Sequence, residues 1–152
     1  MTDFEHPDAA KLLADAQQEL ARRYGSEDET PMDADEFTPP NGMLLVGYHD
    51  DEPVACGGWR ARDGDGPGLR EGDAEIKRMF VMESARGNGF ARALLAELER
   101  TAAATGRHRM VLETGLAQPE AIALYTSAGY TEVEKFGHYR CNDLSRCYAK
   151  PL

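Results

Sequence analysis

The feature that most constrains the fold is a β-type run at residues 74–82 that leads through a glycine-rich turn into a strongly periodic helix. The turn ends in Arg86-Gly87-Asn88-Gly89, and the helix carries its apolar side chains on one stripe: Phe90, Ala91, Leu94, Leu95, Leu98 and Ala102. Glycines let backbone amides approach a ligand, and the first turn of a helix carries a partial positive charge. The segment therefore predicts a site for a pyrophosphate group, although an ordinary tight turn has a similar sequence.

This turn differs from two familiar phosphate-binding motifs. Arg92 stands where the dinucleotide fingerprint G-x-G-x-x-G requires a third small residue. The G-K-[ST] sequence of a P-loop is absent as well. The turn therefore belongs to neither class.

Strand-like and helix-like stretches alternate through the second half of the chain. Helices are expected over residues 7–24 and 119–128, with a short helix near Ala34, and further strands over residues 43–48, 53–62, 110–113, 130–134 and 146–150. The first two strands flank an acidic turn and predict an antiparallel hairpin, on which Trp59 packs. The alternation predicts a mixed α/β domain in three layers.

Length and composition indicate one globular domain. The chain has 152 residues, which fits a single domain over residues 1–152, and 41% of them are hydrophobic. No apolar run approaches the roughly 18 residues of a membrane helix, and the acidic N-terminus lacks a secretory signal, so we expect a cytoplasmic protein without membrane association. The three cysteines form no C-x-x-C pair and the four histidines are scattered, which predicts free thiols and no metal site.

The net charge of −10 is unevenly distributed along the chain. Residues 1–75 hold 19 acidic against 6 basic residues, whereas residues 76–152 hold 8 against 11. An acidic chain repels the phosphates of nucleic acids, so we expect no nucleic acid partner. The more basic half suits a small phosphorylated ligand. The acidic half is typical of a solvated surface, with a preference for cationic substrates as the alternative.

Two further patterns accompany the glycine-rich turn. Arg86, Gly89 and Ala91 form an R-x-x-G-x-A pattern after an A-E-I-type strand. The later helix adds an A-x-x-x-Y-x-x-x-G-Y pattern, which falls on Ala121, Tyr125, Gly129 and Tyr130. With these spacings, residues 74–130 resemble the GCN5-related N-acetyltransferase (GNAT) family. The resemblance covers the first half of the chain only through its expected helix and hairpin.

The resemblance implies a three-layer α/β/α domain whose twisted mixed sheet has about six to seven strands, with about four helices. In this fold the strand ending near Val81 and the strand ending near Glu113 splay apart to admit the pantetheine arm of acetyl-CoA. The implied activity is acetyl-CoA-dependent N-acetyl transfer by direct attack of an amine on the thioester. The acetyl-CoA-binding core would span about residues 74–130. Homodimers are common in the family, and a homodimer is a further expectation.

The resemblance also implies which residues hold acetyl-CoA. The expected set is Met79, Phe80, Val81, Arg86, Gly87, Asn88, Gly89, Phe90, Ala91, Arg92 and Gln118. Backbone amides near Phe80 and Val81 are expected to stabilise the oxyanion. Amides of the turn should contribute more to phosphate binding than the side chains of Arg86 and Arg92. Gln118 stands where the family commonly has an asparagine that contacts pantetheine, and it retains the amide.

Acetyl transfer needs a neutral amine, but a lysine-like amine with a pKa near 10.4 is almost entirely protonated at pH 7. A base or a path of water molecules is therefore required. Glu75 lies eleven residues before Arg86, the spacing at which some family members carry a catalytic glutamate, and burial would raise its pKa. The alternative is a structural carboxylate paired with Lys77 on the same face of the strand.

Tyr125 is the expected general acid. Coenzyme A leaves more easily when its sulfur is protonated, and the resemblance places the Tyr125 hydroxyl near that sulfur. The alternative role is packing on the apolar face of its helix, together with Ile122 and Ala128.

The acceptor is a small-molecule or peptide amine whose identity the sequence leaves open. Candidates for its site lie near strand ends and in the C-terminal loop: Trp59, Arg60, Glu113, His138 and Tyr139. Arg60 or Arg78 in the pocket would favour an amino acid carboxylate, whereas Glu113 with the acidic loop would favour a polyamine or a cationic peptide N-terminus. Two other functions stay open, namely use of another acyl-CoA and a non-catalytic acyl-CoA-binding module.

Overall fold

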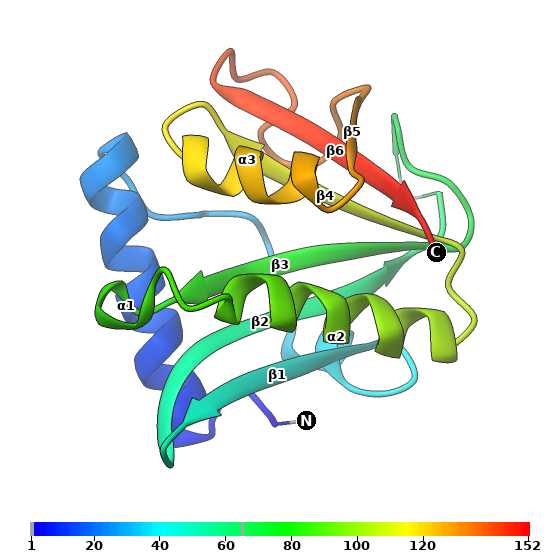
Figure 1. The fold of residues 1–152 in the computed structure, drawn as a ribbon. Helices are drawn as coiled ribbons and strands as arrows, with labels where there is room; N and C mark the ends of the chain where they lie inside the picture. The colour runs from blue at the N-terminus through cyan, green and yellow to red at the C-terminus, as the bar shows by residue number, and fades with distance from the viewer. Residues whose placement is uncertain (1, 65) are drawn as a thin grey trace.

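The computed structural model describes residues 2–64 and 66–152. Its central feature is a six-stranded mixed sheet with the strand order β1-β2-β3-β4-β6-β5 (Figure 1). The strands are β1 (Gly42–His49), β2 (Glu52–Arg62), β3 (Asp73–Val81), β4 (Arg109–Gly115), β5 (Thr131–Val133) and β6 (Ser145–Pro151). β3 and β4 are parallel, and the other neighbouring pairs are antiparallel. The six strands expected from the sequence are thus confirmed, with ends displaced by at most two residues.

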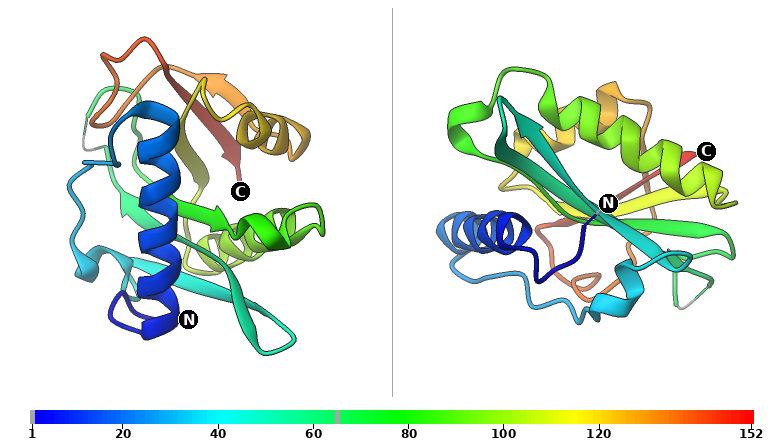
Figure 2. Two further views of the ribbon diagram at one scale, coloured as in Figure 1. Left: turned by 90° about the vertical axis from the view of Figure 1, so that its left-hand side faces the viewer. Right: turned by 90° about the horizontal axis from the view of Figure 1, so that it is seen from below.

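Three α-helices cover the sheet: α1 (Pro7–Tyr24), α2 (Phe90–Ala104) and α3 (Pro119–Ser127). Two short 3₁₀ helices, η1 (Ala34–Phe37) and η2 (Glu83–Ala85), lie in connecting segments. Figure 2 shows α2 and α3 on one face of the sheet and α1 with η1 on the other, which gives the expected three layers. The described residues contain one α-helix fewer than the sequence predicted, because the segment near Ala34 forms a single 3₁₀ turn.

The two faces of the sheet are packed differently. Toward α2 and α3 lies the larger hydrophobic core, in which the Trp59 indole nitrogen donates a hydrogen bond to the Thr101 hydroxyl at 3.0 Å. The expectation that Trp59 packs on the sheet is confirmed, because it is 1% exposed. On β2 and β3 several charged side chains are buried instead: Arg60, Asp73, Glu75 and Lys77. Burying so many charges requires that they be paired, and this polar region borders the site.

β3 and β4 separate along their length. They pair only over the first part of each strand, from Asp73 to Ile76 on β3. Beyond that point β3 continues to Val81 and β4 to Gly115 without pairing, so the sheet opens between them (Figure 1). A bulge against β2 lies in the same part of β3 and places Arg78 at a φ of 59°. The expected splaying of these two strands is confirmed.

Candidate functional site

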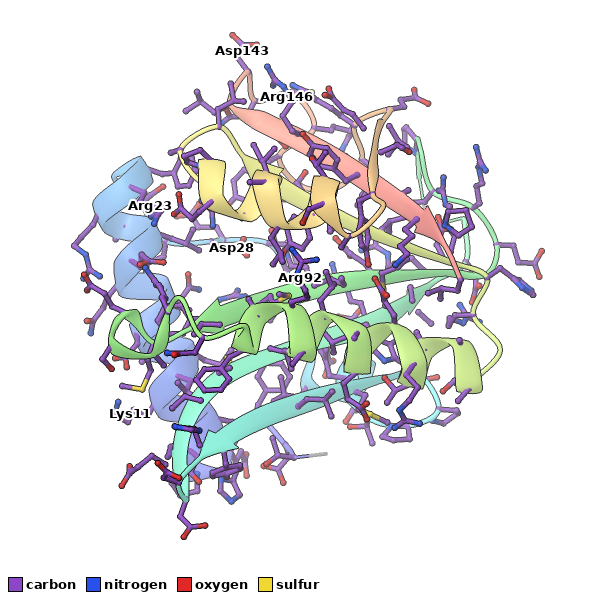
Figure 3. The ribbon with its side chains drawn as sticks, in the orientation of Figure 1. Lys11, Arg23, Asp28, Arg92, Asp143 and Arg146 are labelled. Atoms are coloured by element: carbon purple, nitrogen blue, oxygen red, sulfur yellow. The ribbon has the colours of Figure 1, made fainter. Side chains whose placement is uncertain are left out.

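A cleft of about 270 Å³ occupies the opening between β3 and β4. It is bordered by α1, by α3 and by loops that include residues 26–28 and 139–144. Figure 3 shows Asp28 in this opening, and Arg23 at the end of α1 beside it. Of the residues that the sequence suggested, the cleft lining includes Met79, Phe80, Gln118 and Tyr125, together with the acceptor candidates Glu113 and Tyr139.

The glycine-rich turn presents uncapped backbone amides at the start of α2. Gly87 and Gly89 have φ values of 83° and 81°, which other residues adopt only at a cost. Gly89 is the N-cap, and no side chain caps the helix, so the amides of its first turn lack a partner from the cap. No atom lies within 4 Å of a Cβ built on either glycine. The turn therefore fits a bound anionic group such as a pyrophosphate.

The two arginines of this region already have protein partners. Arg86 Nη2 donates to Glu19 on α1 at 2.6 Å, and its Nε donates to the Val81 carbonyl at 3.0 Å. Arg92 points from α2 toward α3 (Figure 3), where its Nη2 donates to the Ser127 hydroxyl at 2.6 Å. Both guanidinium groups thus brace helices, and the backbone amides are the groups left for a ligand.

The remaining residues expected in the donor site shape the turn. The Asn88 side-chain amide donates to the Ala85 carbonyl at 2.9 Å, which closes the turn. Phe90 and Ala91 are partly buried against the larger core and fix the start of α2. Their packing holds the first turn of α2, and with it the backbone amides of that turn, against the core.

Tyr125 holds a phenol in the cleft. It is 7% exposed, and its hydroxyl lies 3.8 Å from the Met79 sulfur. A thioether is a weak acceptor, so the phenol keeps its capacity to donate to a stronger one. Burial raises the pKa of Tyr125 to about 12, which keeps the phenol protonated at neutral pH. The group is therefore available as a proton donor.

Gln118 lies immediately before α3 and lines the cleft. Its side-chain oxygen accepts a hydrogen bond from the Tyr24 hydroxyl at 3.2 Å. The end of α1 approaches this connection closely, because a Cβ on Gly115 would overlap Tyr24. Arg23 adds a hydrogen bond to the Ala117 carbonyl at 2.9 Å. α1 thus fixes the β4–α3 connection, and with it the position of Gln118.

The surroundings of Glu75 count against the sequence-based assignment of this residue as the base. Its side chain is 2% exposed and is absent from the cleft lining. Its Oε1 accepts from Arg60 Nε at 2.9 Å and from Arg62 Nη1 at 2.8 Å. Two guanidinium groups hold the carboxylate in place, which suits the structural alternative. The pairing partners differ from the expected one, because Lys77 pairs with Asp28.

Glu113 is the carboxylate that the cleft leaves without a partner. It lies on β4 and lines the cleft, and its Oε2 is buried without a hydrogen bond. Burial raises the pKa of Glu113 to about 7 from an ordinary 4.5. Lys77 and the nearby Ser145 hydroxyl oppose this shift, and the negative charges of Glu75 and Asp28 reinforce it. A carboxylate with a pKa near neutrality is suited to general-base catalysis.

A small charged cluster lies beside Glu113. Asp28 Oδ2 is 3.3 Å from Lys77 Nζ and 3.5 Å from Arg78 Nε. Burial disfavours the charged form of Asp28, but Lys77, hydrogen bonds from Thr30 and Arg78 outweigh it and lower its pKa to about 2. Asp28 belongs to the acidic loop that the sequence suggested beside Glu113, but nothing in that sequence distinguishes this carboxylate from the others in the loop.

The other acceptor candidates are distributed differently. Trp59 belongs to the core, and Arg60 is 4% exposed and bonded to Glu75, so neither lines the cleft. Tyr139 does line it, and its hydroxyl accepts from the Glu29 amide at 2.6 Å. This bond joins the C-terminal loop to the loop that carries Asp28.

Within residues 2–64 and 66–152, no three or more His, Cys, Asp or Glu side chains are grouped so as to hold a metal ion. In the same residues, no helix is both long and apolar enough to cross a membrane.

A mixed sheet that opens between two parallel strands, with an uncapped helix start after the first of them, defines an acyl-transfer fold. The chain belongs to the acetyltransferase (GNAT) family, whose model matches residues 10–130. The resemblance stated from the sequence is thus confirmed, and the chain is an acetyltransferase of this family.

Individual relatives agree with the family assignment. The IAA acetyltransferase of Azospirillum brasilense is 34% identical over 142 residues, which cover 93% of this chain and 89% of the relative. A Klebsiella pneumoniae protein, assigned by inference as an acyl-CoA N-acyltransferase, has a structure with a TM-score of 0.79 and 30% identity over 99% of this chain and 94% of its own. PaiA N-acetyltransferase of Thermoplasma acidophilum, solved with coenzyme A, shares the fold with a TM-score of 0.60 at 12% identity over 74% of this chain and 62% of its own.

Proposed function

We propose that the protein is an N-acetyltransferase that moves the acetyl group of acetyl-CoA to the primary amine of a small acceptor by direct attack on the thioester. The observation that carries this proposal is that Glu113 and Tyr125 line the same cleft. The buried Oε2 of Glu113 has no partner, and the protonated phenol of Tyr125 lines the same opening between β3 and β4. A base and an acid on either side of a reacting centre are what acetyl transfer to an amine requires.

The donor would lie along the glycine-rich turn and in the opening of the sheet. The uncapped amides after Gly89 suit its pyrophosphate, and the opening between β3 and β4 suits its pantetheine arm. Acetyl-CoA supplies an activated carbonyl carbon. Residues 79–81 carry backbone amides on a part of β3 that has no strand partner on the β4 side, and these amides are the candidates for stabilising the oxyanion.

Glu113 and Tyr125 divide the proton transfers. Glu113 accepts a proton from the acceptor ammonium, directly or through water, so that the amine attacks as a neutral nucleophile. The new C–N bond forms as the C–S bond breaks. Tyr125 donates its proton to the departing sulfur and is then reprotonated from solvent. The attacking nitrogen loses its second proton to solvent as the neutral amide forms. We prefer Glu113 to Glu75 as the base because Glu75 is committed to Arg60 and Arg62.

The names of similar proteins do not agree on an acceptor. The Azospirillum brasilense relative is named for IAA. A Brucella melitensis protein of the same fold, 22% identical over the whole of both chains with a TM-score of 0.70, is named for ribosomal-protein alanine. These names therefore do not identify an acceptor for this chain.

Thermal unfolding tests the donor half of the proposal. Acetyl-CoA at about 100 times its dissociation constant should stabilise the fold by about 2.7 kcal/mol and raise the midpoint by several degrees, with NADH and ATP as controls. Release of free CoA thiol with a panel of amines then tests catalysis. A midpoint that acetyl-CoA leaves unchanged would remove the basis of the proposal. Tight binding without CoA release on any amine would instead indicate a non-catalytic acyl-CoA-binding module.

A further inference from the structure

Four buried polar atoms among the described residues have no hydrogen-bond partner. They are Thr30 Oγ1, Arg78 Nε, Glu113 Oε2 and Ser145 Oγ. Three of these residues, Arg78, Glu113 and Ser145, line the same cleft. Buried polar groups are nearly always paired in folded proteins, so a cluster of unpaired ones indicates where a ligand supplies the missing partners.

The chemistry of these atoms specifies the ligand. A carboxylate oxygen such as Glu113 Oε2 accepts hydrogen bonds, whereas the Nε of Arg78 only donates them. The first therefore matches an amine, and the second matches an anionic oxygen. A guanidinium group suits a carboxylate in particular, because its planar donors match the two carboxylate oxygens.

A distortion of β3 brings Arg78 into the cleft. In a regular strand, consecutive side chains point to opposite faces, so Lys77 and Arg78 would not share a site. The bulge breaks this alternation, and both side chains approach Asp28 and line the cleft. Arg78 has a φ of 59°, a conformation that costs free energy in a residue other than glycine. Such strain is typical of functional positions.

The two cations of the cleft lining, Lys77 and Arg78, lie together at Asp28, whereas the other charged residues of the lining are the acidic Glu19, Glu27 and Glu113. Lys77 and Arg78 share a single close carboxylate, that of Asp28, and the Arg78 side chain is 11% exposed. A polyamine would bring further positive charge to these two cations. The Arg78 Nη2 donates to the Asp28 carbonyl at 3.4 Å, and its Nε has no hydrogen bond. An acceptor with a carboxylate would supply a partner for this Nε while its amino group faces Glu113.

We propose that the acceptor is a small amino acid, whose amino group lies at Glu113 and whose carboxylate lies at Arg78. This proposal rests on the N-acetyltransferase function proposed above and names its substrate class. In the reaction the ammonium group loses one proton to Glu113, and the neutral amine forms a C–N bond as the acetyl C–S bond breaks. The new amide nitrogen loses its second proton to solvent, and the sulfur takes a proton from Tyr125, which is reprotonated from solvent. The products are an N-acetyl amino acid and coenzyme A.

The test compares matched acceptors in the CoA-release assay. Common amino acids are screened first, and each active one is then compared with its carboxamide and its decarboxylated amine. Loss of a charged hydrogen bond should lower kcat/KM by about 10- to 100-fold for both analogues, mainly through KM. Spermidine should be a poor acceptor.

The variant Arg78→Asn removes the guanidinium group, and asparagine tolerates a positive φ better than most residues. The preference for the amino acid over its carboxamide should disappear in this variant. The exposed Arg100 provides the matched control, and Arg100→Asn should keep the preference.

Two failures are distinguishable. Faster turnover of carboxamides, decarboxylated amines or spermidine than of amino acids, or an undiminished preference in Arg78→Asn, would overturn the acceptor class and leave the acetyltransferase intact. Absence of CoA release with every amine, despite a midpoint raised by acetyl-CoA, would overturn the proposed function and the acceptor class with it.

Discussion

The proposed donor site and the proposed acceptor site, called the donor half and the acceptor half below, are built from different groups. In the donor half, the groups that would face acetyl-CoA are backbone amides, held by a turn of consecutive residues between η2 and α2, next to the cleft lining. In the acceptor half, they are charged side chains from β3, β4 and two loops far apart in the sequence. A short contiguous turn is specified by its own residues, mainly by glycines at positive φ. A side-chain cluster depends on the whole fold.

The difference also extends to stability. The acceptor half places a carboxylate with a raised pKa beside two cations, whereas the donor half leaves amides uncapped at a helix start. Ionisation of Glu113 opposes folding, and carboxylates with such raised pKa values are concentrated at functional sites. Substitutions in the two halves should therefore separate the effects on turnover, on donor binding and on folding.

The largest effect is expected for Glu113→Gln. Loss of the base should lower kcat/KM by about 10²- to 10³-fold and remove the acidic limb of the pH profile, along which activity rises with pH through about 7. The folded pKa of this carboxyl lies above its ordinary 4.5, so its ionisation destabilises the fold as pH rises from 4.5 through 7. The variant should thus be about 1–2 kcal/mol more stable than the parent at pH 8, with no gain at pH 4.

Glu75→Gln is the matched control for Glu113→Gln. It breaks the buried pairs with Arg60 and Arg62 and should cost about 3 kcal/mol of stability. The folded variant should keep the acidic limb of the pH profile, moved to lower pH because Glu75 helps to raise the pKa of Glu113. Denaturant unfolding and pH–rate profiles measure both quantities. If the acidic limb of the pH–rate profile were lost in Glu75→Gln and kept in Glu113→Gln, Glu75 would be the base and Glu113 the structural carboxylate.

A smaller loss is expected for Tyr125→Phe. The Tyr125 hydroxyl has one weak contact among the described residues, to the Met79 sulfur at 3.8 Å. Its removal should therefore change the free energy of unfolding little. Without a proton donor at the sulfur, kcat should fall by about 10- to 100-fold. Single-turnover rates and acetyl-CoA titrations separate this loss from binding. A weakened acetyl-CoA affinity with unchanged kcat would assign Tyr125 to packing, the alternative that the sequence left open.

The same contrast explains what the sequence predicted well. The strand–turn–helix unit depends on local periodicity and on Gly87 and Gly89, and its position and conformation were expected. The proposed base was harder to choose from the sequence, because Glu75 and Glu113 both stand in short β-type runs. Only the fold shows that Arg60 and Arg62 from β2 both bond Oε1 of Glu75, whereas Oε2 of Glu113 is buried without a hydrogen bond.

The alternation of side chains along a regular strand could not predict that Arg78 lines the cleft. A strict period of two places it away from Lys77, and the bulge that brings both into the cleft is a tertiary feature. One signal was present in the sequence, namely Gly57-Gly58 in the interior of the facing strand. Glycines within a strand often mark a bulge or a close approach. A Cβ on Gly58 would lie 2.8 Å from the Met43 carbonyl oxygen, so close approach is required there.

A donor-side effect of moderate size is expected for Gly89→Ala. The Cβ would extend into open space at the uncapped N-terminus of α2, and we expect it to weaken acetyl-CoA binding by about tenfold, or 1.4 kcal/mol. Gly106→Ala is the control, because Gly106 also has a positive φ, 93°, and open space around a built Cβ. Both variants should lose about 1 kcal/mol of stability, but only the first should bind acetyl-CoA more weakly by calorimetry. Equal affinities would make the turn a purely structural element.

The smallest effect is expected for Arg86→Gln, although a cation next to a phosphate site is the obvious target for mutation. Glu19 neutralises this guanidinium at 2.6 Å, and its Nε is bonded to the Val81 carbonyl. Partly exposed ion pairs contribute about 0–1 kcal/mol, so the midpoint should fall only slightly. Acetyl-CoA affinity should change by less than about threefold, because backbone amides carry the binding.

Salt dependence sharpens this last expectation. If the side chain of Arg86 left Glu19 to contact a phosphate, Arg86→Gln would weaken acetyl-CoA binding strongly at low ionic strength and much less at high ionic strength. Amide binding predicts the same small change at both. A loss of tenfold or more confined to low salt would show that the donor half, like the acceptor half, depends on a charged side chain, and the contrast between the two halves would no longer hold.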